Sequence, residues 1–118
     1  MKKLQTKDVF SFARLIKTAG VTKEVKDLAM KVEAGEKINI REAGATLIFS
    51  IIEGLSTTES ERKFYEFFAN PFEMEVKDIE SLGILELLNK VEELIKLENP
   101  EEYKAFFKSV ARALNKTS

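Results

Sequence analysis

The chain has 118 residues, of which 44% are hydrophobic and 33% charged, and its net charge is −1. This size and composition predict one folded domain and exclude a disordered segment. Because the chain contains neither Cys nor His, disulfides, cysteine nucleophiles and thiolate metal sites are excluded, and the commonest general base and metal ligand is missing.

The first two predicted helices form a hairpin. Apolar residues recur at helical spacing from Val9 to Ala19, after a plausible N-cap at Thr6, and Gly20 offers a left-handed stop. The pattern repeats after Thr22 and ends at Gly35, so a second helix follows a very short turn. We expect the two helices to pack as an antiparallel or angled pair.

The stretch from Asn39 to Leu55 is the most apolar part of the chain. Its central residues, Ala43 to Ile52, carry no charge, and Asn39 with Glu42 has capping-box spacing. Apolar residues fall on all sides of the predicted helix, which is typical of a helix that its neighbours cover. We therefore predict that it is the buried centre of the fold. The alternative is that this stretch lies near a surface that binds another chain.

A phenylalanine-rich helix is predicted after Thr58, which has capping-box spacing with Glu61. It is expected to stop near Asn70, because Pro71 cannot continue a helix. A loop then leads to one or two short helical turns between Val76 and Leu82.

Two amphipathic helices are predicted in the last third of the chain. The first has an apolar stripe from Ile84 to Leu97. The second starts at Asn99, with a proline at its first position, Pro100, and acids in its first turn. Basic residues lie opposite its apolar face.

No segment alternates like a strand over four or more residues between hairpin turns, apart from a brief stretch at residues 37–40. We predict an all-α fold: a compact bundle of six to seven helices around the apolar helix at about residues 40–55. Residues 1–118 form a single helical domain in this prediction, with the last few residues flexible.

No membrane segment is predicted, since the apolar stretch is shorter than the roughly 20 residues that span a bilayer. The first ten residues have three lysines but no apolar run behind them, so we expect no signal peptide and a cytoplasmic protein.

The charges form blocks along the chain. Residues 1–31 hold eight Lys and Arg against three acids, residues 73–102 hold three Lys against ten acids, and residues 103–118 hold four basic residues and no acid. Such blocks either steer a partner or a second copy, or neutralise one another within the fold.

The carboxylate pairs Glu92–Glu93 and Glu101–Glu102 are the strongest candidates for catalysis or metal binding. Catalytic carboxylates work when burial or a like charge shifts their pKa, whereas these lie on the polar faces of helices. Dimetal bundles use Glu-x-x-His motifs, and this chain has no His. We expect no enzyme activity, no metal and no cofactor.

Several apolar residues lie off the buried stripes of their predicted helices or in a loop, and they are candidates for partner binding: Phe10, Met30, Phe72, Met74 and Leu85. Met and Phe side chains suit adaptable hydrophobic recognition. The alternative is that these residues fill a second apolar layer within the chain.

A basic stripe on the last predicted helix is a possible electrostatic patch, formed by Lys104, Lys108, Arg112 and Lys116. Together with the basic N-terminal hairpin it supports an alternative function as a small nucleic-acid-binding or regulatory adaptor. The hairpin itself is a poor DNA reader, since its second helix alternates basic and acidic residues. Cations near a helix C-terminus are also favoured by the helix dipole alone.

The order of the segments resembles the tail assembly chaperones of long-tailed bacteriophages and prophages of Gram-positive bacteria. A lysine-rich start runs into an amphipathic hairpin, then an apolar helix, then FYEFFANPFEMEVKDIESLGILELLNKVEEL, then FFKSVARALNK. The most characteristic piece is Phe67 to Leu94, where a helix ends at Asn-Pro-Phe and two acidic helices follow.

The resemblance implies a cytoplasmic, non-enzymatic protein of the bacterial host that is absent from the mature virion. Such a protein binds the tape measure protein, keeps it soluble and assists tail tube assembly, with the major tail protein as a possible second partner. A homo-oligomer is also possible, while binding to a membrane or to nucleic acid is not expected.

Overall fold

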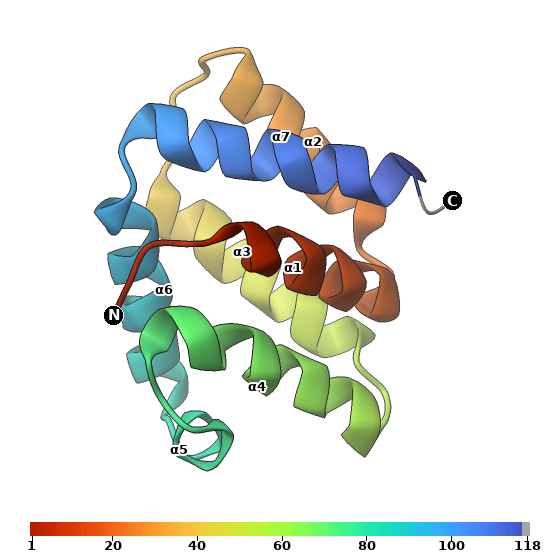
Figure 1. The fold of residues 1–118 in the computed structure, drawn as a ribbon, viewed down its shortest axis with the longest axis vertical. Helices are drawn as coiled ribbons and strands as arrows, with labels where there is room; N and C mark the ends of the chain where they lie inside the picture. Colours follow the sequence, from red (N-terminus) through yellow and green to blue (C-terminus); the bar gives the residue numbers. More distant parts are fainter. Residues whose placement is uncertain (117–118) are drawn as a thin grey trace.

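The computed structural model describes residues 1–116, and the side chains as far as Asn115. This part of the chain folds into seven helices without a strand, which confirms the predicted all-α bundle (Figure 1). The helices are α1 Thr6–Ala19, α2 Thr22–Glu33, α3 Ile40–Gly54, α4 Thr58–Phe72, α5 Val76–Glu80, α6 Ile84–Leu97 and α7 Pro100–Lys116. The prediction that the last few residues are flexible concerns a segment that lies partly outside residues 1–116.

Local hydrogen bonds fix the helix ends close to their predicted places. The N-cap of α1 is Gln5, one residue before the predicted Thr6, and its backbone N–H donates to Asp8 Oδ2 at 2.7 Å. Gly20 ends α1 in the left-handed region with a φ of 73°, as predicted. Asn99 caps α7, since its side-chain oxygen accepts from the backbone N–H of Glu102 at 2.9 Å.

Helix α1 has the central place in the packing, although one of its faces, with Phe10, Arg14 and Lys17, is exposed. It packs against α7, α4, α3 and α2, and its Leu15 and Ile16 are fully buried (Figure 1). A helix at the centre needs a broad apolar surface, and α1 buries five of its apolar side chains for this purpose: Phe12, Ala13, Leu15, Ile16 and Ala19.

The prediction that the apolar stretch is the buried centre is wrong for most of its residues. Helix α3 has close to the predicted bounds, but only its Ile48 and Ile51 are buried. Phe49 is 45% exposed and Ile52 41% exposed. The reason is that α3 packs mainly against α1 and α6, so its outer side has no helix over it.

The predicted end of α4 at Asn70 is also wrong. Pro71 lies in the last turn of α4, and the helix ends only at Phe72, followed by Glu73 in the left-handed region with a φ of 56°. A proline in the final turn costs one hydrogen bond, but its fixed φ is helical. Burial of Phe72, which stacks on Phe68 at 4.9 Å between ring centroids, compensates for that loss.

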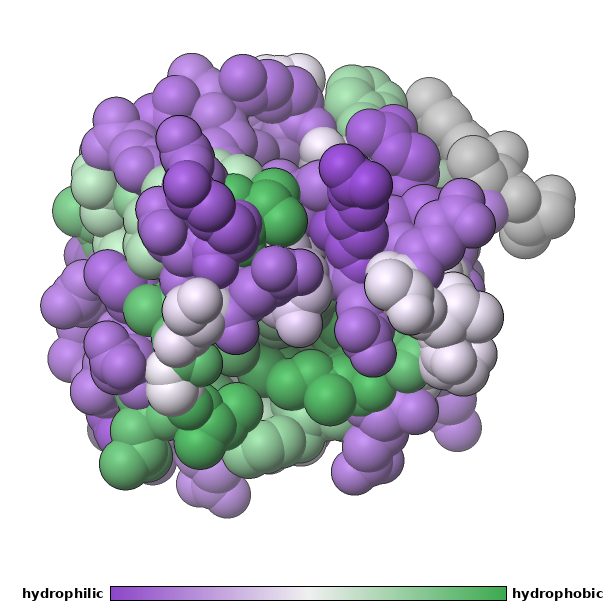
Figure 2. Space-filling view, turned by 90° about the horizontal axis from the view of Figure 1, so that it is seen from below, coloured by the Kyte–Doolittle hydropathy of each residue, from purple (hydrophilic) through white to green (hydrophobic). Residues whose placement is uncertain are grey.

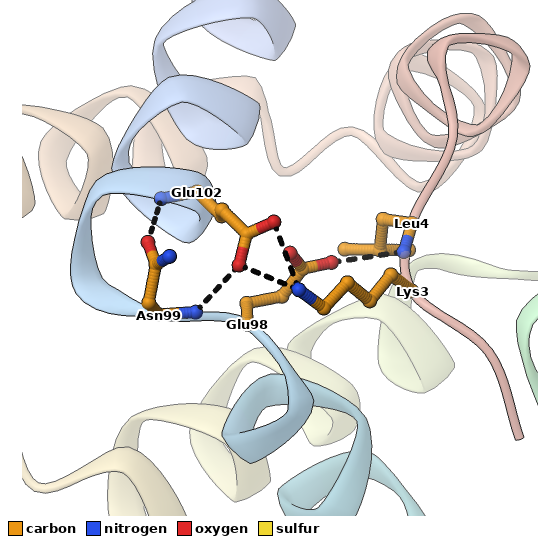
Figure 3. A network of polar contacts seen from close by, with 5 residues as sticks. All are labelled: Lys3, Leu4, Glu98, Asn99 and Glu102. Atoms are coloured by element: carbon orange, nitrogen blue, oxygen red, sulfur yellow. Dashed lines mark hydrogen bonds and ion pairs between the residues drawn. The ribbon is translucent and has the colours of Figure 1, made fainter.

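The segment before α1 ties distant parts of the chain together. The backbone N–H of Lys2 donates to the carbonyl oxygen of Pro71 at 2.8 Å. The backbone N–H of Leu4 donates to Glu98 Oε1 at 2.8 Å, and Lys3 Nζ lies 3.0 Å from Glu102 Oε1 (Figure 3). These bonds hold the start of the chain against the end of α4 and the turn between α6 and α7.

Candidate partner-binding surface

The five predicted partner-binding residues lie in different environments. Met30 is 67% exposed, Leu85 66% and Phe10 55%, so these three side chains are free to meet another molecule. Phe72 and Met74 are predicted to bind a partner because both are expected in a loop, but Phe72 is the last residue of α4. Phe72 is buried in the last turn of α4, where it stacks on Phe68, and Met74 is half-buried against the core.

Leu85 lies at one end of a larger apolar surface that is shared by α3 and α6. The two helices run antiparallel. Arg41 Nη1 near the start of α3 lies 3.4 Å from Glu92 Oε2 in the later part of α6, and Ile52 near the end of α3 lines the same hollow as Ile84 at the start of α6. The later part of α3 is therefore beside the start of α6. We call the exposed residues of this region the α3–α6 surface, and they are Phe49, Ile52, Ile84 and Leu85.

A hollow of about 270 Å³ opens at one end of the α3–α6 surface. Its walls come from α3, α4, α5 and α6, and the residues that line it are Ile52, Leu55, Glu61, Phe64, Tyr65, Ile79, Glu80, Leu82, Ile84 and Leu87. Viewed from this end, the molecule shows apolar side chains gathered along one side (Figure 2). The hollow and the exposed side chains together offer another chain both a flat apolar contact and a pocket.

The polar groups around this hollow are acidic. Glu61 and Glu80 line it, and Glu53 follows Ile52 on α3. Burial raises the pKa of the Tyr65 phenol, and the negative charges of Glu61 and Glu80 raise it further. Within residues 1–116, none of these three glutamates has an ion-pair partner.

Basic side chains at the other end of the α3–α6 surface are already engaged. Arg41 Nη1 lies 3.4 Å from Glu92 Oε2, and Lys96 Nζ lies 3.2 Å from Glu92 Oε1. Hydrogen bonding by Lys96, together with the charges of Lys96 and Arg41, holds the pKa of Glu92 below its ordinary value. The charges without an ion-pair partner around the hollow are therefore negative.

A second, smaller apolar pocket of about 90 Å³ lies under the inner side of α3. It is lined by side chains from α1, α2, α3, α4, α6 and α7, including Gly44, Leu47, Val91 and Phe106. Side chains that border an empty space lack contact atoms on that side and lose dispersion energy. Helix α3 is thus exposed on its outer side and incompletely packed on its inner side.

The predicted basic stripe on α7 is only partly available. Lys108 Nζ lies 3.5 Å from Glu33 Oε1 of α2, and Lys104 is half-buried, while Arg112 is exposed. The side chain of Lys116 lies outside the described residues. Because Glu33 of α2 pairs with Lys108, this contact supports the alternative that the charges of the chain neutralise one another within the fold.

Residues 1–116 contain no group of three or more acidic residues that could hold a metal ion, and none of their helices is long and apolar enough to span a bilayer. Comparison with known protein families, with curated proteins and with solved structures finds no match to this chain.

Of the four residues of the α3–α6 surface, the sequence singles out only Leu85 as exposed. Ile84 belongs to a predicted apolar stripe, and Phe49 and Ile52 belong to the predicted buried helix, for which a binding surface is the alternative. The apolar residues of α3 are spread around more of the helix than one buried face requires. This spread indicates that part of the apolar surface of α3 must be covered either by another helix of this chain or by another molecule.

Proposed function

We propose that this protein is a non-enzymatic tail assembly chaperone that binds apolar helical segments of the tape measure protein, keeps that protein soluble and assists assembly of the tail tube. It acts in the cytoplasm of the bacterial host and is absent from the mature virion. The major tail protein is a second partner in this proposal.

The exposed α3–α6 surface carries the proposal. Exposed apolar patches that are rimmed by polar residues mark sites of interaction with other proteins. Two antiparallel helices with a hollow at one end of their shared surface suit a third helix that lays its apolar face on them. The resemblance in segment order supplies the identity of the partner, and the candidate carboxylates on exposed helix faces offer no competing catalytic site.

Co-expression with the tape measure protein tests the function. The unaltered chain is expected to raise the soluble yield of that protein and to co-purify with it. Leu85→Ser is expected to reduce both, because it removes an apolar contact from the α3–α6 surface, while the thermal midpoint of the chaperone changes little.

Met30→Ser is the matched control, since Met30 on α2 is exposed to nearly the same extent as Leu85. It is expected to co-purify like the unaltered chain. If the unaltered chain neither raises the yield nor forms a complex, the proposed function is wrong. If Met30→Ser alone weakens the complex, the function stands but the surface lies on α2.

A further inference from the structure

The charges around the α3–α6 surface restrict what it can bind. Glu61 and Glu80 line its hollow and Glu53 follows Ile52 on α3, all three without ion-pair partners among the described residues. Arg41 and Lys96, at the other end of the surface, both contact Glu92. A helix that entered the groove with acids beside its apolar face would bring like charges together at low dielectric, which is unfavourable.

The same charges disfavour a second copy of this chain as the occupant. In a two-fold dimer the same patch meets itself, so residue i of one copy faces residue j of the other. A dimer in which the two hollows face each other would place two sets of Glu61 and Glu80 around one apolar contact.

From this complementarity we propose that the α3–α6 surface selects amphipathic helices whose apolar face is flanked by Lys or Arg. This inference rests on the proposed function in that it names the chemistry of the segment to be bound. A large apolar side chain of the partner enters the hollow beside Ile52 and Ile84, and the flanking cations pair with Glu61 and Glu80 at its rim. Glu53 attracts cations along the edge of α3.

Two synthetic peptides test the selection without the tape measure protein. Both are amphipathic helices of about 18 residues, or about five turns, with the same leucine-rich face. One carries Lys at the flanking positions and the other carries Glu. Binding of each to the full chain is measured by calorimetry or fluorescence anisotropy at low and at high salt.

The Lys-flanked peptide is expected to bind about tenfold more tightly than the Glu-flanked peptide at low salt, because up to three exposed ion pairs are gained and repulsion is avoided. The difference should shrink at high salt, since exposed charges are screened. Combined replacement of Glu53, Glu61 and Glu80 by Gln is expected to abolish the difference.

A matched variant replaces Glu24, Glu36 and Glu101 by Gln and changes the net charge by the same amount at other exposed positions. It should keep the preference for the Lys-flanked peptide. Equal binding of the two peptides to the unaltered chain, or an equal effect of the two triple variants, would overturn the inference. So would a dimer of the free chain that Leu85→Ser dissociates.

The two failures can be told apart. If the Lys-flanked peptide binds selectively but the tape measure protein does not co-purify, the surface chemistry is right and the proposed function is wrong. If the tape measure protein co-purifies but the peptides do not differ, the function stands and the charge selection is wrong.

Discussion

Gly54 lies where the end of α3 passes the end of α1. A Cβ atom built on Gly54 overlaps the backbone carbonyl oxygen of Ala19, and a backbone atom cannot rotate away as a side chain does. We expect Gly54→Ala to push the two helices apart and to destabilise the fold by about 1–3 kcal/mol, the range for overpacked sites. Urea unfolding measures this loss.

Gly44 provides the matched control in the same helix. A Cβ atom there would lie 3.6 Å from Val91 Cγ1, which is an ordinary contact, and it would point toward the pocket under α3. Gly44→Ala should therefore stabilise the protein by about 0.5–1 kcal/mol through helix propensity. If both variants lost the same free energy of unfolding, close packing against Ala19 would not be the reason that position 54 needs glycine.

Glu102 links stability to pH at the start of α7. Hydrogen bonds from the Asn99 backbone N–H and from Lys3 hold the pKa of Glu102 below its ordinary value (Figure 3). A carboxyl group whose pKa is lower in the folded state stabilises the fold above its unfolded pKa, and this contribution is lost as the pH falls through the folded value.

We accordingly expect Glu102→Gln to lower the thermal midpoint slightly at pH 7, because Lys3 loses its partner. The midpoints of the variant and the unaltered chain should begin to converge as the pH falls below the ordinary Glu pKa of about 4.3, and they should meet only below the lower pKa of the folded state, where the unaltered carboxyl is protonated as well. Thermal unfolding at a series of pH values measures both. A difference that persists unchanged into acid would contradict the role of the ionised carboxylate.

At the scale of the single element, one side of α3 is buried and the other is exposed. Ile51 is fully buried, whereas Phe49, two residues earlier, is nearly half exposed. We expect Ile51→Asp to unfold the domain, because it buries a charge without a partner. Phe49→Asp should remain folded, with a loss smaller by several kcal/mol, and circular dichroism with thermal unfolding compares the two. Similar unfolding of both would mean that α3 is covered on both sides.

The sequence predicts where the helices begin and end better than it predicts which of their side chains are buried. The ends of α1, α3 and α7 depend on local signals, such as Gly20, Asn39 and Asn99, that act within a few residues. Whether a neighbour covers Phe49 depends on packing between distant segments, and apolar spacing along one helix does not contain that information. For the same reason burial of Phe72 could carry α4 past Pro71.

For the whole molecule, composition and periodicity are enough for the fold class but not for the binding surface. The prediction of an all-α bundle needed only the seven amphipathic or apolar segments and the lack of strand alternation. The candidate surface required knowing which helices meet. The pairing of α3 with α6 places Leu85, predicted as exposed, beside residues predicted as core.

The position of α7 in the bundle bears on how the chain folds as it is made. Helices α1 and α2 are synthesised first, yet the helix that packs against both of them is α7, the last one (Figure 1). The bond from Leu4 to Glu98 likewise joins residues 94 positions apart. Contacts of such separation form late and slow folding. Until α7 leaves the ribosome, the apolar stripes of α1 and α2 lack their cover, so the nascent chain passes through an aggregation-prone stage of its own.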